Sequence, residues 1–331
     1  MLLYKRPKAP PCGGLGGLTI THSQLTIRNF LFHRVSDETN ALWPPMHPTL
    51  FEKIIRYLTG NFKVVLLEDY LKDPSSYKRE KNLATVCFDH GYGDNIEKAA
   101  PLLLRYRCPA SFYVVTDCID RNVPTWTYIT DLFFQHAGNK KLQLENDFVP
   151  VSLQNIEWNN AEEAKEWGRK VKPWMKSLPN SQRLWVMQQI EQQNKGAGIP
   201  QKIMMSWSEV KELHEAGFYI GSHSHTHPML ASLAGEEELF NELSVSSEKI
   251  QQQLGEKPLT ISYPIGSWDN RVVNASVKAG YHYGLAVEQR FYKPEADNKF
   301  CIPRVELYNE PWWKARLRIS GLYQTVKNLV R

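Results

Sequence analysis

Three histidines alternate with serine and threonine in the segment GSHSHTHP, residues 221–228. They are three of only ten histidines in the chain. His223 and His227 are four residues apart, so a helical turn here would place both imidazoles on one side, where they can share a borderline metal such as Zn²⁺. His225 would then point elsewhere. The spacing therefore favours a metal site over a simple polar loop.

A second segment that can carry chemistry is FDHGY, residues 88–92, which follows a short apolar stretch and precedes a predicted helix. In parallel β/α folds the active site lies where the strands end, which is where Asp89 and His90 fall. The alternative is that Asp89 caps the helix and His90 faces solvent. A third segment, ISYPIGSW at residues 261–268, also follows a strand, and its Pro-x-Gly turn exposes backbone N–H groups that can hold an oxyanion.

Taken together and in this order, the three segments resemble the polysaccharide deacetylase family, whose NodB-homology members are metal-dependent carbohydrate esterases. The family's first motif, T-F-D-D-G-Y, corresponds to VCFDHGY at residues 86–92. The second, H-S/T-x-x-H, is matched by His223, Ser224 and His227, and the third, R-x-P-Y-G or Y-P-Y-G, by YPIG at residues 263–266. The resemblance covers about residues 25–306, apart from an insertion.

This resemblance implies a fold, a reaction and a set of site residues. The fold is a distorted (β/α) barrel of about seven strands, and the reaction is hydrolysis of an N-acetyl group on a sugar or polysaccharide. Asp89 would be the general base that deprotonates a metal-activated water. His90, His223 and His227 would hold a divalent metal ion, with Zn²⁺ as the expected ion. The metal and the Ile265 backbone N–H would stabilise the oxyanion.

The sequence departs from the family pattern at three positions. His90 stands where the family has a ligand aspartate, and since imidazole is a competent Zn²⁺ ligand, a three-histidine site with an open position is chemically reasonable. Ser262 stands where the family has the arginine that orients the base, and Ile265 where it has a tyrosine. These changes keep two other hypotheses open: a non-catalytic carbohydrate-binding descendant, and a hydrolase of another non-peptide C–N bond such as a cyclic imide.

Several further roles are assigned as expectations. Arg304 opens the last strand-like segment, so we expect it to replace the missing arginine beside Asp89. Tyr263 and Trp268 are expected to contact the sugar, with core packing as the alternative. The family's late general-acid histidine has no match in this chain, which leaves His225 or a water to protonate the departing amine.

Strands that alternate with helices must position these segments, and this alternation is typical of a parallel β/α architecture. Ser206 and Glu209 predict a capping box at the start of one helix, and Gly255 predicts the end of another. Helices are expected at 48–58, 96–107, 206–217, 232–254 and 272–279. The predicted strands are 25–35, 63–67, 85–89, 110–115, 218–222, 261–263 and 281–287.

The chain divides into three predicted parts. Residues 1–24 contain prolines and a GGLGG run and are interpreted as a loose arm. Residues 25–311 form the barrel, interrupted at about 117–203 by a segment without β-α alternation, which we interpret as a mostly helical insertion because a structureless loop of that length is implausible. Residues 312–331 form a basic, amphipathic tail.

Composition restricts the class of protein. The 331 residues are 42% hydrophobic and 23% charged, which excludes a disordered chain. The net charge of +5 is too weak to indicate a nucleic-acid partner. No apolar run reaches about 18 residues, the length that predicts a spanning helix. The N-terminus lacks the apolar region of a secretory signal, and the five cysteines form no C-x-x-C pair, so we expect a cytoplasmic enzyme.

The tail has two interpretations. It holds five basic residues and no acidic one, and Trp313 and Leu317 fall near one helical face together with Val326, Leu329 and Val330. A basic amphipathic helix that bears tryptophan can lie on an anionic membrane, which would place the enzyme at the periphery of the inner membrane. The alternative is a helix packed on the barrel with its basic face in water. The sequence leaves the oligomeric state and the identity of the N-acetylated sugar open.

Overall fold

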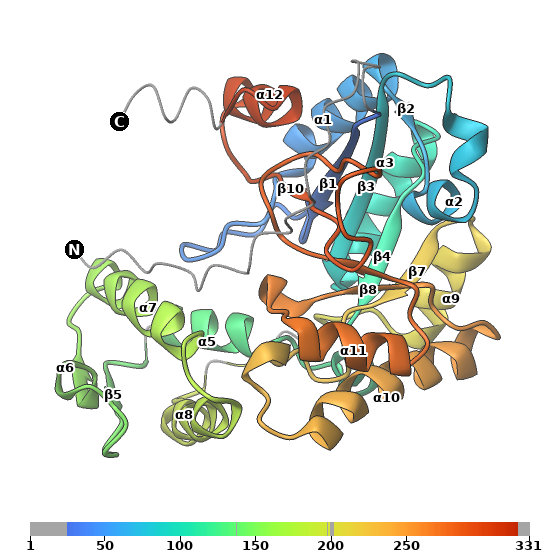
Figure 1. The fold of residues 1–331 in the computed structure, drawn as a ribbon. Helices are drawn as coiled ribbons and strands as arrows, with labels where there is room; N and C mark the ends of the chain where they lie inside the picture. Colours follow the sequence, from blue (N-terminus) through green and yellow to red (C-terminus); the bar gives the residue numbers. More distant parts are fainter. Residues whose placement is uncertain (1–24, 137, 197, 199–201, 324–331) are drawn as a thin grey trace.

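The computed structural model describes residues 25–136, 138–196, 198 and 202–323 (Figure 1). Its centre is a curled sheet of parallel strands in the order β10-β1-β3-β4-β7-β8-β9, and β2 pairs beside β3. The predicted distorted (β/α) barrel is therefore confirmed, as an open half-barrel. The strands are β1 Ile27–Phe32, β2 Lys63–Val64, β3 Leu83–His90, β4 Ser111–Val114, β7 Tyr219–Ser222, β8 Thr260–Ser262, β9 Tyr283–Leu285 and β10 Val305–Glu306.

The register of the sheet brings the chemistry-bearing segments to one edge. Every residue of β3 is buried, as expected for a strand that is covered on both faces and reads as an apolar run. His90, the last residue of β3, pairs with Val114 on β4, and Val114 pairs with Ser222 at the end of β7. Because Ser222 precedes His223 directly, the first two motifs meet at the carboxyl edge of the sheet.

Helices connect and cover these strands. Most of the predicted helix signals are confirmed: Ser206 and Glu209 form a capping box at α9, and Gly255, with φ of 85°, ends α10 in the left-handed region. The helices are α1 Pro48–Asn61, α2 Leu67–Lys72, α3 Ala100–Arg105, α4 Thr116–Arg121, α5 Trp126–Gln135, α6 Val151–Gln154, α7 Ala161–Met175, α8 Asn180–Gln193, α9 Trp207–Glu215, α10 Glu236–Leu254, α11 Asn270–Lys278 and α12 Trp312–Ser320.

Two predicted helices differ from the structure. The helix expected at 96–107 is a π-helical turn, Asn95–Ala99, followed by the short α3. Pro101 in the first turn of α3 explains this, since its missing N–H and its ring disfavour a continuous i to i−4 ladder. The helix expected from residue 232 begins at Glu236, because residues 230–232 form a separate 3₁₀ turn.

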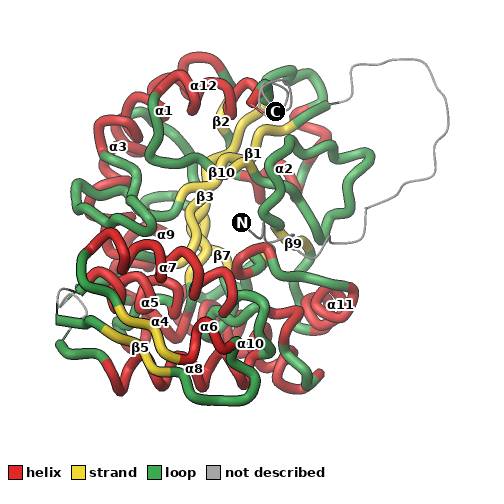
Figure 2. Tube along the Cα trace, turned by 90° about the vertical axis from the view of Figure 1, so that its left-hand side faces the viewer, coloured by secondary structure: helices red, strands yellow, loops and turns green. Residues whose placement is uncertain are grey.

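The segment between β4 and β7 contains helices α4 to α9 and also an antiparallel pair, β5 Lys141–Gln143 with β6 Asn155–Glu157. The sequence did not predict this pair. Helices α5, α7 and α8 gather at one end of the molecule in both views (Figures 1 and 2). They enclose a hydrophobic cluster of their own, which includes Phe133, Ile156, Val171 and Val186. This segment therefore packs as a unit rather than as a loop.

At the carboxyl end, α12 lies beside α1, where the Trp312 ring is 5.4 Å from that of Tyr57. Ala315 and Ile319 are buried in the main core cluster. Trp312 makes this contact with the barrel, whereas Trp313 is 58% exposed, so the membrane interpretation of the tail stays a prediction. The predicted arm, 1–24, and tail residues 324–331 lie outside the described residues. Among the residues described, no helix has the length and apolarity needed to cross a membrane.

Candidate active site

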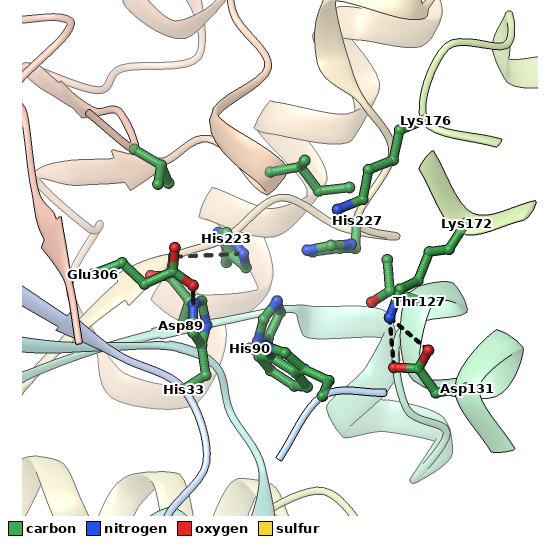
Figure 3. A pocket seen from close by; sticks show the side chains of 13 residues that line it. His33, Asp89, His90, Thr127, Asp131, Lys172, Lys176, His223, His227 and Glu306 are labelled. Carbon is green, nitrogen blue, oxygen red and sulfur yellow. Dashed lines mark hydrogen bonds and ion pairs between the residues drawn. The ribbon is translucent and has the colours of Figure 1, made fainter. Parts of the chain in front are cut away.

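A pocket opens at the carboxyl edge of the sheet, between the barrel and the segment that follows β4 (Figure 3). Its empty volume, which includes space open to solvent, is about 680 Å³, within the usual range for ligand pockets. Its walls come from β3, β10, α5, the end of α7 and the loops after β1, β7, β8 and β9. The lining residues are His33, Trp43, Asp89, His90, Thr127, Asp131, Lys172, Lys176, His223, His227, Ile265, Val287 and Glu306.

Three of these residues, His90, His223 and His227, form a nearly equilateral triangle. Their ring centroids are 4.9 to 5.0 Å apart, and one nitrogen of each lies within 4.8 Å of the others. All three side chains are buried. The structure thus brings together the three residues that the sequence predicted as metal ligands.

The backbone that presents these imidazoles is not helical, so the expected helical turn from His223 to His227 is wrong. Ser224 and His227 both have positive φ, 66° and 63°, and the chain bends between them. His90 also has positive φ, 84°, and Gly91 follows at 88°. Left-handed residues other than glycine are uncommon and cluster at functional sites, because surrounding contacts must offset their strain. The triangle depends on these turns, not on helical periodicity.

Hydrogen bonds around the triangle fix the orientation of two of its members. The Nδ1–H of His223 donates to the Ser262 carbonyl at 2.7 Å, which leaves Nε2 as the free lone pair. The indole Nε1–H of Trp126 donates to the His227 carbonyl at 3.2 Å. Trp126 is itself buried, and this hydrogen bond supports the strained turn at His227.

The donor set fits a metal ion. The Nδ1 atom of His90 and both ring nitrogens of His227 are buried and have no hydrogen-bond partner among the described residues, an arrangement that is costly unless a ligand occupies them. Burial lowers the pKa of His223 to about 4 and holds the pKa values of His90 and His227 well below their ordinary value. Neutral imidazoles that converge in this way are typical of Zn²⁺ sites.

Asp89 lies beside the triangle and is held by Arg304. The Nη1 and Nη2 atoms of Arg304 lie 2.8 and 3.0 Å from Oδ1 and Oδ2 of Asp89, a bidentate pair between two buried side chains. The expected contact between these residues is therefore confirmed. Ser262, at the position of the missing motif arginine, donates to Asp89 Oδ1 at 3.0 Å and accepts from Arg304 Nη2 at 2.8 Å.

These contacts decide the charge on Asp89. Burial alone opposes ionisation, but the adjacent Arg304 charge and its hydrogen bonds outweigh that effect and hold the pKa of Asp89 far below its usual range. The carboxylate therefore stays ionised. Its Oδ1 accepts from both Arg304 and Ser262. Among the described residues, its Oδ2 accepts from Arg304 alone, and it lies 3.9 Å from His223 Nε2, which makes it the oxygen nearer the triangle.

Ile265 forms another part of the pocket wall and has left-handed backbone angles, φ 59° and ψ 10°. For a β-branched residue this conformation is strained. The strain is maintained by the short turn Pro264–Gly266, in which the Gly266 N–H donates to the Tyr263 carbonyl at 2.9 Å. The residue expected to supply a backbone N–H thus reaches the pocket.

Two residues that we had expected to contact substrate do not reach this pocket. Tyr263 is fully buried and packs in the cluster that contains Ile261 and Val272, so its assignment is wrong. Trp268 is half-buried against the same cluster and is not among the lining residues, so its contact with the sugar stays a prediction. His225 points away from the triangle, with Nδ1 2.9 Å from Thr116 Oγ1, and it lines a different surface hollow.

His33 and Glu306 belong to the site and were missed. His33 Nε2 lies 3.0 Å from Glu306 Oε1, and the His33 ring stacks on His90 with centroids 5.0 Å apart (Figure 3). The Nδ1 atom of His33 is buried without a hydrogen-bond partner among the described residues. Asp89 was predicted as a site residue because it lies at the carboxyl end of a strand. His33 directly follows β1 and meets the same criterion, so the sequence did contain a signal for it.

The segment between β4 and β7 supplies four further lining residues: Thr127, Asp131, Lys172 and Lys176. Thr127 and Asp131 are on α5, whereas Lys172 is on α7 and Lys176 directly follows it. Lys172 Nζ lies 2.5 and 2.7 Å from the two carboxylate oxygens of Asp131. Nothing in the local sequence pattern points to these residues, because their position depends on how α7 packs against α5.

A family model described as polysaccharide deacetylase matches residues 76–284. A poly-beta-1,6-N-acetyl-D-glucosamine N-deacetylase of Staphylococcus aureus is 25% identical over 130 residues, which are 37% of this chain and 44% of that protein. The corresponding protein of Staphylococcus epidermidis is 27% identical over 116 residues, 32% of this chain and 39% of that protein. The match thus spans less than half the length of these relatives.

Solved structures share the fold. The Streptococcus pyogenes deacetylase PplD in complex with acetate superposes with a TM-score of 0.60 at 14% identity, covering 92% of this chain and 99% of that chain. A de-N-acetylase from Aggregatibacter actinomycetemcomitans gives a TM-score of 0.56 at 16% identity, covering 89% of this chain and 99% of that chain. At these identities the likeness establishes the fold and leaves the activity to be argued from the site.

Proposed function

Because this chain belongs to the polysaccharide deacetylase family, we propose that it hydrolyses N-acetyl groups of a glycan and releases acetate and a free amine. The observation that carries this proposal is the Asp89 carboxylate, ionised and fixed by Arg304, next to three converging neutral imidazoles. A purely glycan-binding descendant has no need for this arrangement. The names of the curated relatives make poly-beta-1,6-N-acetyl-D-glucosamine the first substrate to test.

His90, His223 and His227 are the residues that would hold a divalent cation, with Zn²⁺ favoured by their all-nitrogen donor set. When bound, such an ion supplies Lewis-acid polarisation of the amide carbonyl. The His223 tautomer is already correct for this role, since Nδ1–H is committed to the Ser262 carbonyl and Nε2 faces the pocket. A set of three neutral ligands leaves more positive charge in the site than the family's Asp-His-His set.

Asp89 orients the attacking water and accepts its proton at Oδ2, the oxygen nearer the triangle. Arg304 binds both carboxylate oxygens and Ser262 binds Oδ1, and these bonds keep the carboxylate from rotating. The low pKa of Asp89 makes it a weak base in isolation, so its contribution depends on its fixed position beside the site. Ile265 supplies its backbone N–H to the oxygen that becomes negatively charged.

His33 is the group that protonates the departing amine. Glu306 accepts the hydrogen bond from Nε2 and so orients the ring, while Nδ1 has no partner among the described residues and is the atom that serves the amine. His225 has no part in this step, because its ring is directed at Thr116 outside the pocket. His33 thus fills the role for which the family's late histidine has no counterpart in this chain.

The proposal is tested by measuring acetate release from poly-beta-1,6-N-acetyl-D-glucosamine and from other N-acetylated glycans, together with the metal content of the purified protein. We expect acetate release that a chelator abolishes and that Zn²⁺ restores, with about one metal ion per chain. Glycan binding without acetate release from any of these substrates, by protein that contains its full complement of metal, would establish the non-catalytic alternative instead.

A further inference from the structure

The contact between His33 and Glu306 continues away from the active-site pocket to Tyr308. Glu306 Oε1 accepts the hydrogen bond from His33 Nε2 at 3.0 Å (Figure 3). The other carboxylate oxygen, Oε2, accepts a hydrogen bond from the Tyr308 hydroxyl. The two oxygens of Glu306 thus bond in two directions, one into the site and one away from it, and rotation of the carboxylate would break one bond or the other.

The pairing of β10 with β1 explains how these three side chains meet. Leu31 on β1 pairs with Glu306, and the Leu307 N–H donates to the Leu31 carbonyl at 3.0 Å. Leu307 is buried in the main core cluster, so alternation along this strand end turns its two neighbours, Glu306 and Tyr308, to the other side. Both neighbours are half-buried there, on the side where His33 follows β1.

The helix α12 holds the ring of Tyr308. The Arg318 guanidinium on α12 lies over this ring, 4.7 Å from its centroid, which is within the range of a cation–π contact. Glu310 fixes Arg318 in turn, because its Oε1 lies 2.5 Å from Arg318 Nε, and both of these side chains are largely buried. A series of direct contacts therefore runs from α12 through Tyr308 and Glu306 to His33.

Tyr308 lies outside the active-site pocket. It lines a neighbouring hollow, which shares His33 and Trp43 with that pocket, and it is not among the residues that line the pocket itself. Any effect of Tyr308 on the reaction would therefore pass through Glu306 and His33. In this respect it differs from Asp89, whose carboxylate faces the three histidines directly.

We propose that Tyr308 is a positioning residue for proton transfer to the departing amine, and that Arg318 keeps Tyr308 in place. This inference rests on the proposed function, in which the C–N bond of the N-acetyl group breaks and a water oxygen bonds to the acetyl carbon. The water gives one proton to Asp89, the amine nitrogen takes one from His33, and exchange with solvent resets both groups. The Tyr308 hydroxyl holds the Glu306 carboxylate so that His33 Nδ1 stays directed at that nitrogen.

The test uses the leaving group as its readout. The amine of an N-acetyl glycan needs a proton in order to leave, whereas the 4-nitrophenolate of 4-nitrophenyl acetate needs none. We measure kcat for oligomers of poly-beta-1,6-N-acetyl-D-glucosamine and for this ester, counting only the part of the ester rate that Asp89→Asn removes. Loss of positioning lowers the ratio of glycan kcat to ester kcat, whereas damage to the fold or to the metal site lowers both rates.

Tyr308→Phe removes the hydroxyl and keeps the ring under Arg318. It should lower the ratio of glycan to ester kcat by about tenfold or more, because the proton donor is no longer held in place. Tyr323→Phe is the matched control, since it removes a hydroxyl from the other ring beside Arg318, 3.8 Å from the guanidinium. Equal ratios in these two variants would overturn the proposal.

The contribution of α12 is tested by exchanging arginine for lysine. Arg318→Lys keeps the charge beside Glu310 but loses the planar group over the Tyr308 ring, and it should lower the same ratio by about two- to fivefold. Arg316→Lys makes the same exchange on α12 over a different ring, that of Tyr57, and should leave the ratio unchanged. A ratio that Arg318→Lys leaves unchanged would overturn the role of α12.

A double-mutant cycle tests whether Tyr308 acts through Glu306. Glu306→Ala removes the carboxylate that joins Tyr308 to His33. Tyr308→Phe should then have no further effect on the ratio in the Glu306→Ala background. Losses that multiply in the double variant would show that Tyr308 acts by another route, and would overturn the proposal.

Failure of this inference differs from failure of the proposed function. Acetate release with an unaltered ratio in Tyr308→Phe sinks the inference and leaves the deacetylase intact. If the unaltered protein releases no acetate from any glycan, the proposed function fails, and nitrogen NMR of the histidine rings still decides the contact, with His33→Gln to assign the signals. The proton of His33 should lie on Nε2 in the unaltered protein and be shared with Nδ1 in Tyr308→Phe. The same single protonated nitrogen in both proteins would overturn the positioning role.

Discussion

The Arg304 guanidinium and the Asp89 carboxylate, which are 215 residues apart in the sequence, form a bidentate ion pair with both side chains buried. Arg304 directly precedes β10, and Asp89 is the penultimate residue of β3. Strand β1 pairs with both of these strands, so the arginine reaches across it to the carboxylate. Ser262, which stands where the family has its arginine, provides a hydroxyl that bonds both partners.

Removing one partner of this ion pair should lower the stability of the fold. Arg304→Met leaves the Asp89 charge buried without a partner, and we expect a loss of about 3–5 kcal/mol in the free energy of unfolding, measured by urea denaturation. The pKa of Asp89 should rise at the same time, because Arg304 no longer offsets the effect of burial. Arg79→Met, at an exposed position, is the control. Equal stability of the two variants would show that the pair is not important for the fold.

The sequence predicted those residues of the site that lie at the carboxyl ends of strands. Asp89, His90 and His223 each lie where an apolar strand stops, and parallel strands bring such positions together. It failed for Tyr263, because a motif does not reveal which side of its loop faces the pocket and which joins the core. It also failed for the turn from His223 to His227, since two left-handed residues replaced the expected helix. Lys172 and Lys176 depend on packing between helices, which has no local signature.

Substitutions of His90 test which residues make up the metal site. His90→Ala should lose most of the bound metal, measured by elemental analysis after dialysis, because it removes one of three ligands. His90→Asp should retain metal, since carboxylate is also a Zn²⁺ ligand and aspartate tolerates the left-handed backbone at this position. His282→Ala, at an exposed histidine, should have no effect. Full metal occupancy in His90→Ala would exclude His90 from the ligand set.

Substitutions of Trp126 test whether the segment between β4 and β7 stabilises the metal site. Trp126→Phe keeps the ring but removes the hydrogen bond to the His227 carbonyl, and we expect metal affinity to fall about 10- to 100-fold in competition with a chelator. Trp313→Phe, at an exposed tryptophan, is the matched control. Trp126→His can still donate a ring N–H and should recover part of the affinity. If Trp126→Phe binds metal as tightly as the unaltered protein, the turn at His227 does not need this support.

The buried carboxyl group of Glu68 should make the stability of the fold depend on pH, independently of catalysis. It is fully buried near the amino ends of β4 and β8, where Ser111, Tyr113 and Thr260 donate hydrogen bonds to it. Burial raises the pKa of Glu68 despite these bonds. The folded state therefore binds more protons than the unfolded state above about pH 4.3, and the Glu68 contribution to stability falls as pH rises from there through the folded pKa.

Glu68→Gln removes this titration. The free energy of unfolding of the variant, measured in urea from pH 4 to pH 8, should improve relative to the unaltered protein as pH rises, by up to about 1.4 kcal/mol per pH unit within the titration range. Glu248→Gln, at an exposed glutamate, should follow the unaltered protein. A difference between the two proteins that stays constant with pH would contradict the raised pKa of Glu68.

The measurement that addresses the central claim most directly is the rate of acetate release by Asp89→Asn from an N-acetylated glycan, together with its metal content. The amide cannot accept a proton, so the account predicts a rate about two to four orders of magnitude lower. Metal content should be nearly unchanged, because the three histidines remain in place. A variant that retains its metal and releases acetate at close to the original rate would contradict the role of Asp89 as the base.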